Sequence, residues 1–282
     1  MKLTPIELYR HNNLKCSRNT TKTYSTSFSL GVRMLKKEYR NHIYSLYGFV
    51  RYADEIVDSL NQFNQERLLH EFKEDTYKAI KRGVSTNPLL DSFQHTVNSC
   101  KIDHSLIDSF LKSMEMDLTQ KYFSQRDLND YIYGSAEVVG LMCLKVFYYN
   151  NSKEYDRLQY PARKLGEAFQ KVNFLRDAED DFVNKGRVYF KDIDFSNFNH
   201  QTKEEIERQI EQDFKEAYPG IVALRKDVRF GVYLAYRYYL SLFKKIKKAP
   251  PRAILLKRYR ISNTQKSFLL LKVAIKNSLG VF

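Results

Sequence analysis

The chain has 282 residues, of which 43% are hydrophobic and 28% charged, a composition typical of a folded globular protein that excludes a largely disordered one. Only 10 glycines and 6 prolines occur and no Gly/Ser/Pro-rich linker divides the sequence, so we expect a single domain over residues 1–282. The 3 cysteines show neither a zinc-binding spacing nor a disulfide framework, which favours a reducing compartment. Because no signal-like or membrane-spanning apolar run occurs, we expect a soluble, cytoplasmic protein.

Apolar residues recur in steps of three and four along most of the chain, whereas the alternation typical of strands is absent. The clearest helical segments are residues 42–60, 127–149, 161–182, 203–218 and 227–248. Proline-containing sequences predict helix boundaries at residues 85–88, 160–161, 218–220 and 249–251. We therefore expect an all-α fold.

The first chemically informative pattern lies in the helix predicted over residues 42–60. Tyr47, Arg51, Asp54 and Asp58 are spaced by four, three and four residues and share one side of that helix, which we call the first acidic face. Glu55 falls off this face, and we expect it to point elsewhere as a solvated neighbour.

The helix predicted over residues 161–182 repeats the arrangement. Gln170, Asn173, Asp177 and Asp181 are spaced by three, four and four residues and form the second acidic face. Like charges one helical turn apart repel by about 0.2–0.5 kcal/mol per pair, so we expect a positive group above them.

Two faces of oxygen ligands that meet across a helical bundle are suited to Mg²⁺, which commonly completes its coordination with waters and substrate phosphates. Neither face has His or Cys at ligand spacing, and the chain lacks a phosphate-binding glycine loop. Two alternatives remain at this point. The acidic residues form a solvated helix surface, or Arg51 and Arg176 neutralise them in structural salt bridges.

The formal charge of +14 is concentrated near the end of the chain. Residues 244–282, the cationic C-terminal stretch, contain eleven Lys and Arg and no Asp or Glu. Such a stretch suits nucleic acid, acidic lipid or a phosphorylated substrate, and we expect it to attach reversibly to an anionic membrane surface.

The two acidic faces carry a family resemblance. "DEIVD" at 54–58 and "NFLRDAEDD" at 173–181 resemble the aspartate-rich signatures of the squalene/phytoene synthase family. "YSTSFSLGVRML", "YIYGSAEVVG", "GEAFQKVNFLRD" and "GRVYF" at 186–190 continue the resemblance in the expected order, from about residue 24 to residue 266. As a set they are most similar to bacterial phytoene synthases.

The resemblance implies a single-domain helical bundle of the class I isoprenoid synthase type with a central apolar cavity. It assigns metal binding and catalysis to Asp54, Asp58, Asp177 and Asp181, with Asn173 as a further metal ligand. It assigns substrate binding to Ser27, Phe28, Tyr47, Arg51, Tyr133, Gln170, Arg176, Tyr239 and Arg260.

Thr26 and the segment "YGSAEVVG" each add an expectation about the site. Many family members have a basic residue between the two serines of the first motif, where this chain has Thr26, so we expect Arg33 or the C-terminal cations to compensate. In "YGSAEVVG", the small residues permit close helix packing, line the prenyl tunnel, or do both; they are Gly134, Ser135, Ala136 and Gly140.

The activity that the resemblance implies is phytoene synthesis from two geranylgeranyl diphosphates through a cyclopropyl diphosphate intermediate. It uses Mg²⁺, for which Mn²⁺ can substitute, and needs no NADPH. The alternatives are squalene or dehydrosqualene synthesis from C15 substrates, a catalytically silent assembly factor, and a nucleic-acid binder, which no recognised motif supports. The sequence does not give the oligomeric state.

Overall fold

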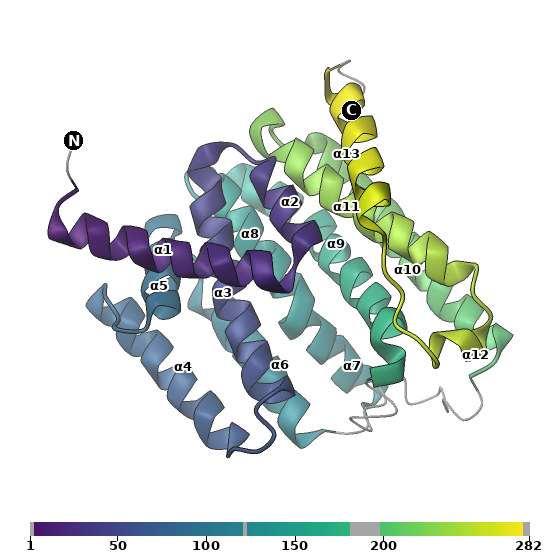
Figure 1. Ribbon diagram of the computed structural model, residues 1–282, viewed down its shortest axis with the longest axis horizontal. Coiled ribbons are helices and arrows are strands. Elements are labelled where there is room, and N and C mark those ends of the chain that lie inside the picture. The colour runs from purple at the N-terminus through teal and green to yellow at the C-terminus, as the bar shows by residue number, and fades with distance from the viewer. Residues whose placement is uncertain (1–2, 121–122, 181–197, 279–282) are drawn as a thin grey trace.

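A computed structural model describes residues 3–120, 123–180 and 198–278. These residues form α-helices joined by short loops, with one π-helical segment, η1, and they contain no β-strand (Figure 1). The elements are α1 Pro5–Tyr24, α2 Thr26–Arg33, α3 Lys37–Asp58, α4 Gln65–Arg82, α5 Pro88–Cys100, α6 His104–Thr119, α7 Gln125–Ile132, η1 Tyr133–Glu137, α8 Val138–Tyr148, α9 Ser152–Glu179, α10 His200–Ala223, α11 Lys226–Lys247, α12 Pro251–Ile254 and α13 Asn263–Ser278. The predicted all-α fold is confirmed.

Several helix boundaries follow from local chemistry. Asn87 caps α5 by accepting a hydrogen bond from the backbone N–H of Leu89 at 3.0 Å, and Pro88 occupies the first helical position. Pro251 likewise begins α12. The boundaries predicted at residues 85–88 and 249–251 are therefore confirmed.

The boundaries predicted at residues 160–161 and 218–220 are wrong. Pro161 lies inside α9 and Pro219 inside α10. The two helices pack closely where Pro161 meets Gly220, because a Cβ atom at Gly220 would lie 2.3 Å from the Cβ of Pro161. Tertiary packing of two long helices thus outweighs the local penalty of a proline in a helix interior.

The buried apolar side chains form two clusters. One is built largely from α3, α4, α5, α6 and α8, and includes Phe49, whose ring stacks on that of Phe93 with centroids 3.8 Å apart. The other is built largely from α7, α9, α10 and α11, and includes Val273 of α13. Val232 of α11 packs against both clusters, so α11 joins the two halves of the core.

The segment η1 lies between α7 and α8 and is closely packed. A Cβ atom at Gly134 would lie 2.5 Å from the carbonyl oxygen of Ser109 in α6, and one at Gly140 would lie 2.9 Å from that of Ala162 in α9. Glycine at both positions therefore permits close helix packing, one of the two roles expected for them. A π-helical turn of this kind often marks a functional site.

Candidate functional site

The first acidic face lies at the C-terminal end of α3, where other carboxylates lie near Asp54. Arg51 forms ion pairs with Asp54, at 3.8 Å, and with Glu55. Burial raises the pKa of Asp54 to about 7; Arg51 opposes this rise, while the charges of Asp58, Asp117 and Glu55 add to it. A cation placed here would relieve that repulsion. The expectation that Glu55 points away is wrong, because the i,i+4 spacing brings it to the guanidinium of Arg51.

The described part of the second acidic face lies at the C-terminal end of α9, where Asp177 is already paired with cations. The Nε of Arg176 donates to Asp177 Oδ1 at 3.0 Å, and the Nε of Arg258 lies 2.7 Å from the same oxygen. Burial acts to lower the pKa of Arg176, but the Asp177 carboxylate and the Tyr239 hydroxyl outweigh it and raise that pKa. Gln170 accepts a hydrogen bond from the amide of Asn173 at 3.3 Å.

Tyr239 of α11 contacts the second acidic face and interacts electrostatically with Tyr47 of the first. Its hydroxyl donates to the amide oxygen of Asn173 at 3.4 Å, and its ring stacks on Phe169 with centroids 3.8 Å apart. Burial raises the pKa of Tyr47 to about 12; Arg51 opposes this, and the charges of Asp54 and Tyr239 add to it. The predicted residues of α3, α9 and α11 are therefore brought together.

The motif near the start of the chain packs against the first acidic face. Ser25 caps α2 by accepting a hydrogen bond from the backbone N–H of Phe28 at 3.2 Å, and the ring of Phe28 stacks on Tyr47 with centroids 4.9 Å apart. Ser27 is half-buried on the same helix. The Arg51 guanidinium lies 4.4 Å from the ring centroid of Tyr24. Packing of α2 against α3 thus positions Phe28, and packing of α1 against α3 positions Arg51.

A cation from the other end of the chain lies beside Thr26. The Nζ of Lys266, in α13, donates to the Thr26 hydroxyl at 2.7 Å. Burial lowers the pKa of Lys266, and the nearby positive charge of Arg260 adds to this effect. Arg33 is exposed at the end of α2. Either Arg33 or the C-terminal cations were expected to compensate for the missing basic residue at Thr26. It is a C-terminal cation, Lys266, that lies beside Thr26.

Other sequence-predicted residues have different surroundings. Tyr133 lies in η1, with the Arg163 guanidinium 5.3 Å from its ring centroid. The backbone carbonyl of Arg260 accepts a hydrogen bond from Lys245 at 2.7 Å, while Arg258, two residues earlier, contacts the second acidic face. Asp181 and the "GRVYF" segment at 186–190 fall outside the described residues, so their assignments stay predictions.

Sequence reasoning missed three residues of this region: Asp117, Arg258 and Lys266. Asp117 lies in α6, accepts a hydrogen bond from the Tyr131 hydroxyl at 3.1 Å, and adds negative charge near Asp54. No spacing pattern within "SMEMDL" distinguishes Asp117 from a surface acid. Arg258 and Lys266 belong to the cationic C-terminal stretch, whose pattern singles out neither of them.

The donor set suits a hard divalent cation, because it consists of carboxylate and amide oxygens. Within residues 3–120, 123–180 and 198–278, however, no three His, Cys, Asp or Glu side chains are grouped closely enough to hold a metal ion on their own. For a metal ion to bind here, each acidic face would supply only part of a coordination shell, and an anionic substrate would have to supply the remainder.

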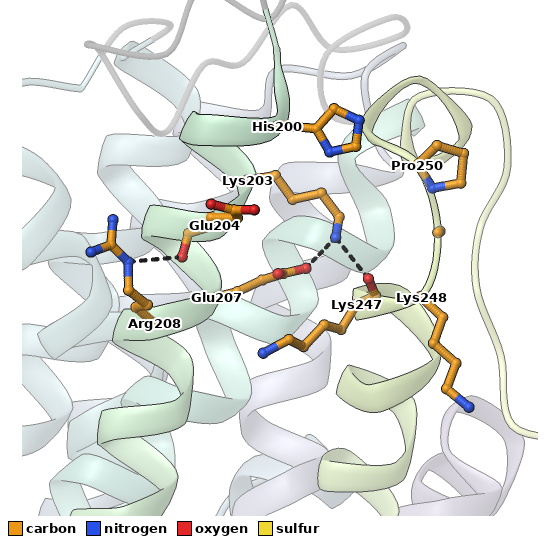
Figure 2. A pocket seen from close by; sticks show the side chains of 9 residues that line it. His200, Lys203, Glu204, Glu207, Arg208, Lys247, Lys248 and Pro250 are labelled. Atoms are coloured by element: carbon orange, nitrogen blue, oxygen red, sulfur yellow. Dashed lines mark hydrogen bonds and ion pairs between the residues drawn. The ribbon is translucent and has the colours of Figure 1, made fainter.

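Two surface hollows lie away from the acidic faces. One, of about 570 Å³, is bordered by α10 and the end of α11; there Lys203 pairs with Glu207 and donates to the Lys247 carbonyl at 3.0 Å (Figure 2). The other, of about 740 Å³, is lined by residues that include Tyr39 and Arg225. Neither is lined by a predicted site residue. Across the described parts of the chain, no helix has the length and apolar character needed to cross a membrane.

Comparisons with known proteins identify the family to which this chain is similar. Residues 21–265 match the squalene/phytoene synthase family. Over 193 residues the chain is 31% identical to the 4,4'-diapophytoene synthase of Staphylococcus haemolyticus (strain JCSC1435), an alignment that covers 66% of this chain and 65% of that protein. Over 269 residues it is 26% identical to the phytoene synthase of Arthrospira platensis, with 85% of each chain covered.

The fold also matches a solved structure. The crystal structure of a dehydrosqualene synthase in complex with a ligand aligns with a TM-score of 0.79, covering 99% of this chain and 100% of that one at 23% identity. The predicted isoprenoid-synthase type of all-α bundle is therefore confirmed.

Proposed function

Because the chain belongs to the squalene/phytoene synthase family, we propose that it is a phytoene synthase that condenses two geranylgeranyl diphosphates head to head in a Mg²⁺-dependent reaction. The observation that carries the proposal is that Tyr239 contacts the second acidic face and interacts electrostatically with Tyr47 of the first, while Arg51, Arg176 and Arg258 pair with the aspartates of these faces. A further cation, Lys266, lies beside Thr26. Oxygen ligands and fixed cations close together suit a substrate whose diphosphate leaves as an anion.

Asp54, Asp58, Asn173 and Asp177 are the described residues that would hold the metal. When bound, Mg²⁺ would act as a Lewis acid on the departing diphosphate. The excess negative charge around Asp54 supports a cation beside the first acidic face. Asp181, outside the described residues, would complete the ligand set.

The arginines and Lys266 would bind diphosphate directly. A guanidinium matches phosphate oxygens in a bidentate geometry, and fixed cations aimed at a leaving group lower the barrier because negative charge grows there in the transition state. Arg176 and Arg258 now share Asp177, so we propose that they turn to phosphate oxygens once that carboxylate binds a cation. Lys266, held beside Thr26, would contact a diphosphate near Ser27.

The prenyl chains would lie among apolar side chains that the core leaves only partly covered. Phe28, Val50 and Tyr133 pack at the edge of one buried cluster, and Phe169 and Tyr239 at the edge of the other. Such a surface would exclude water from the allylic carbocation left when the diphosphate departs. The faces of the aromatic rings would also stabilise its positive charge.

The alternative product is squalene or dehydrosqualene from C15 substrates. The likeness to a phytoene synthase extends over more of the chain, whereas the diapophytoene synthase has the higher identity. We propose the C20 substrate because the motifs as a set resemble bacterial phytoene synthases. The presence of both acidic faces disfavours a catalytically silent assembly factor.

The test is product analysis. Purified protein is incubated with Mg²⁺ and either farnesyl or geranylgeranyl diphosphate, with and without NADPH, and the hydrocarbon is identified by mass. We expect a C40 product from the C20 substrate, unchanged by NADPH and lost when EDTA removes the metal. A C30 hydrocarbon as the sole product from mixed substrates would overturn the chain length, and no hydrocarbon from either substrate would overturn the activity.

A further inference from the structure

Helix α13 has apolar side chains on two opposite sides. Val273 is buried in the core, and Leu269 and Leu270 pack beside it. Phe268, Leu271 and Ile275 point away from that core, and their exposed fractions are 56%, 58% and 49%. These three residues, spaced by three and four positions, form one stripe, which we call the outer apolar face.

The outer apolar face differs from the solvent side of an ordinary surface helix. A helix that covers a core on one side normally carries polar and charged residues on the other. Here the exposed side carries three large apolar residues within about two turns. The pattern indicates that a partner covers α13.

The charges beside the outer apolar face indicate which kind of partner would bind it. Lys272 and Lys276 lie one turn apart along the edge of the outer apolar face, and the Lys272 ammonium is 4.5 Å from the Phe268 ring centroid. No acidic residue occurs anywhere in the cationic C-terminal stretch. An apolar stripe with cations and no acids beside it on the same helix complements a surface with negative headgroups above an apolar layer, namely an anionic bilayer.

The position of α13 connects this surface with the candidate site. α13 lies along α11, the helix that carries Tyr239, and its Lys266 contacts Thr26 in α2 (Figure 1). The side of α13 that faces the protein therefore reaches the proposed diphosphate contacts, while the opposite side is free to face lipid.

We propose that α13 is a membrane-docking helix that lies in the interface of an anionic bilayer. Phe268, Leu271 and Ile275 enter the acyl region, and Lys272 and Lys276 contact the headgroups. The proposal is argued from the exposure and charge of side chains on α13, so it does not depend on which prenyl diphosphate the enzyme uses.

The absence of tryptophan from the chain permits a direct test. Phe268→Trp places a single fluorophore on the outer apolar face. Phe63→Trp is a matched control, because Phe63 is 57% exposed and lies between α3 and α4, far from α13 in Figure 1. With vesicles of mixed phosphatidylglycerol and phosphatidylcholine, we expect the emission of the Phe268→Trp variant to shift to the blue and to be quenched by acyl-brominated lipid. The emission of the Phe63→Trp variant should not change.

Charge variants test the lipid selectivity. Each lysine near an anionic surface contributes about 1 kcal/mol, so Lys272→Gln/Lys276→Gln should weaken vesicle partitioning roughly 30-fold. Lys81→Gln/Arg82→Gln removes the same charge from the exposed end of α4 and should change partitioning less than about threefold, because that helix lies away from the docking surface.

Three other outcomes of these vesicle and fluorescence experiments would overturn the proposal. Equal partitioning onto pure phosphatidylcholine vesicles, or equal loss in both charge variants, would exclude docking through anionic lipid. A lipid-independent blue shift in the Phe268→Trp variant, accompanied by a doubled mass in light scattering, would show that a second copy of the chain covers α13. Because partitioning is measured without turnover, it also separates this proposal from failure of the proposed activity.

Discussion

The two acidic faces share a residue pattern but differ in their balance of charge. On α3, Arg51 is divided between Asp54 and Glu55, and the charge of Asp117 adds to the repulsion. On α9, Asp177 is held by the guanidinium groups of both Arg176 and Arg258. Asp54 therefore shares a single guanidinium group with Glu55, whereas Asp177 is paired with two guanidinium groups.

This difference suggests that the two faces act in different ways. A cation that binds the first face relieves repulsion already present, so that face attracts the metal. A cation that binds Asp177 must replace two guanidinium groups, which then become available to phosphate. Equivalent sequence motifs would thus perform unequal parts of one reaction, and the following predictions test that asymmetry.

The largest expected effect is on turnover. Asp54→Asn and Asp177→Asn each remove a proposed metal ligand while preserving side-chain volume, and we expect each to reduce turnover of geranylgeranyl diphosphate by at least about 10²–10³-fold, as loss of a preorganised electrostatic contact does elsewhere. Glu55→Gln changes a charge beside the first acidic face without removing a ligand and should cost less than about tenfold. Near-normal rates in both aspartate variants would exclude the two-face site.

The second effect concerns the first acidic face alone. Asp117 contributes negative charge near Asp54 without being one of the proposed metal ligands, so Asp117→Asn should weaken the attraction for the metal. We expect the Mg²⁺ concentration for half-maximal turnover to rise about tenfold, with the maximal rate nearly unchanged. Tyr131→Phe removes only the hydrogen bond to Asp117 and should cause a smaller rise. A lower maximal rate at saturating Mg²⁺ would instead indicate that Asp117 contacts the reacting groups.

A third effect concerns Lys266. If its contact with Thr26 places it beside a diphosphate, Lys266→Gln should raise the KM about five- to tenfold with little change in kcat. Arg33→Gln removes an exposed charge from the same helix as Thr26 and serves as the control. The double variant Thr26→Lys/Lys266→Gln places the positive charge at position 26 instead of position 266, and it should restore the KM of the parent. A KM unchanged in Lys266→Gln would remove this residue from the substrate site.

The features that could be predicted from the sequence are those that depend on the spacing of residues within one helix. Residues three and four apart on one helix must share a side, so both acidic faces could be recognised before any fold was known. The sequence did not predict Asp117, Arg258 or Lys266, because each reaches the site through tertiary contacts between segments distant in sequence. The wrong boundary at Pro161 has the same origin, since the contact with Gly220 that stabilises α9 there involves another helix.

The smallest expected effect is on stability, and it compares the two faces most directly. Without metal, Asp54→Asn relieves repulsion and should leave the free energy of unfolding unchanged or slightly raised. Asp177→Asn removes the main carboxylate partner of Arg176, whose side chain is 22% exposed, and should lower the free energy of unfolding by about 1 kcal/mol, roughly a fivefold change in the folding equilibrium. Arg258 contributes little to this loss because its side chain is 50% exposed. Urea unfolding in EDTA, followed by far-ultraviolet circular dichroism, measures both variants against the parent. Equal destabilisation of the two would contradict the asymmetry, because it would mean that the carboxylate on α3 is as well paired as the one on α9.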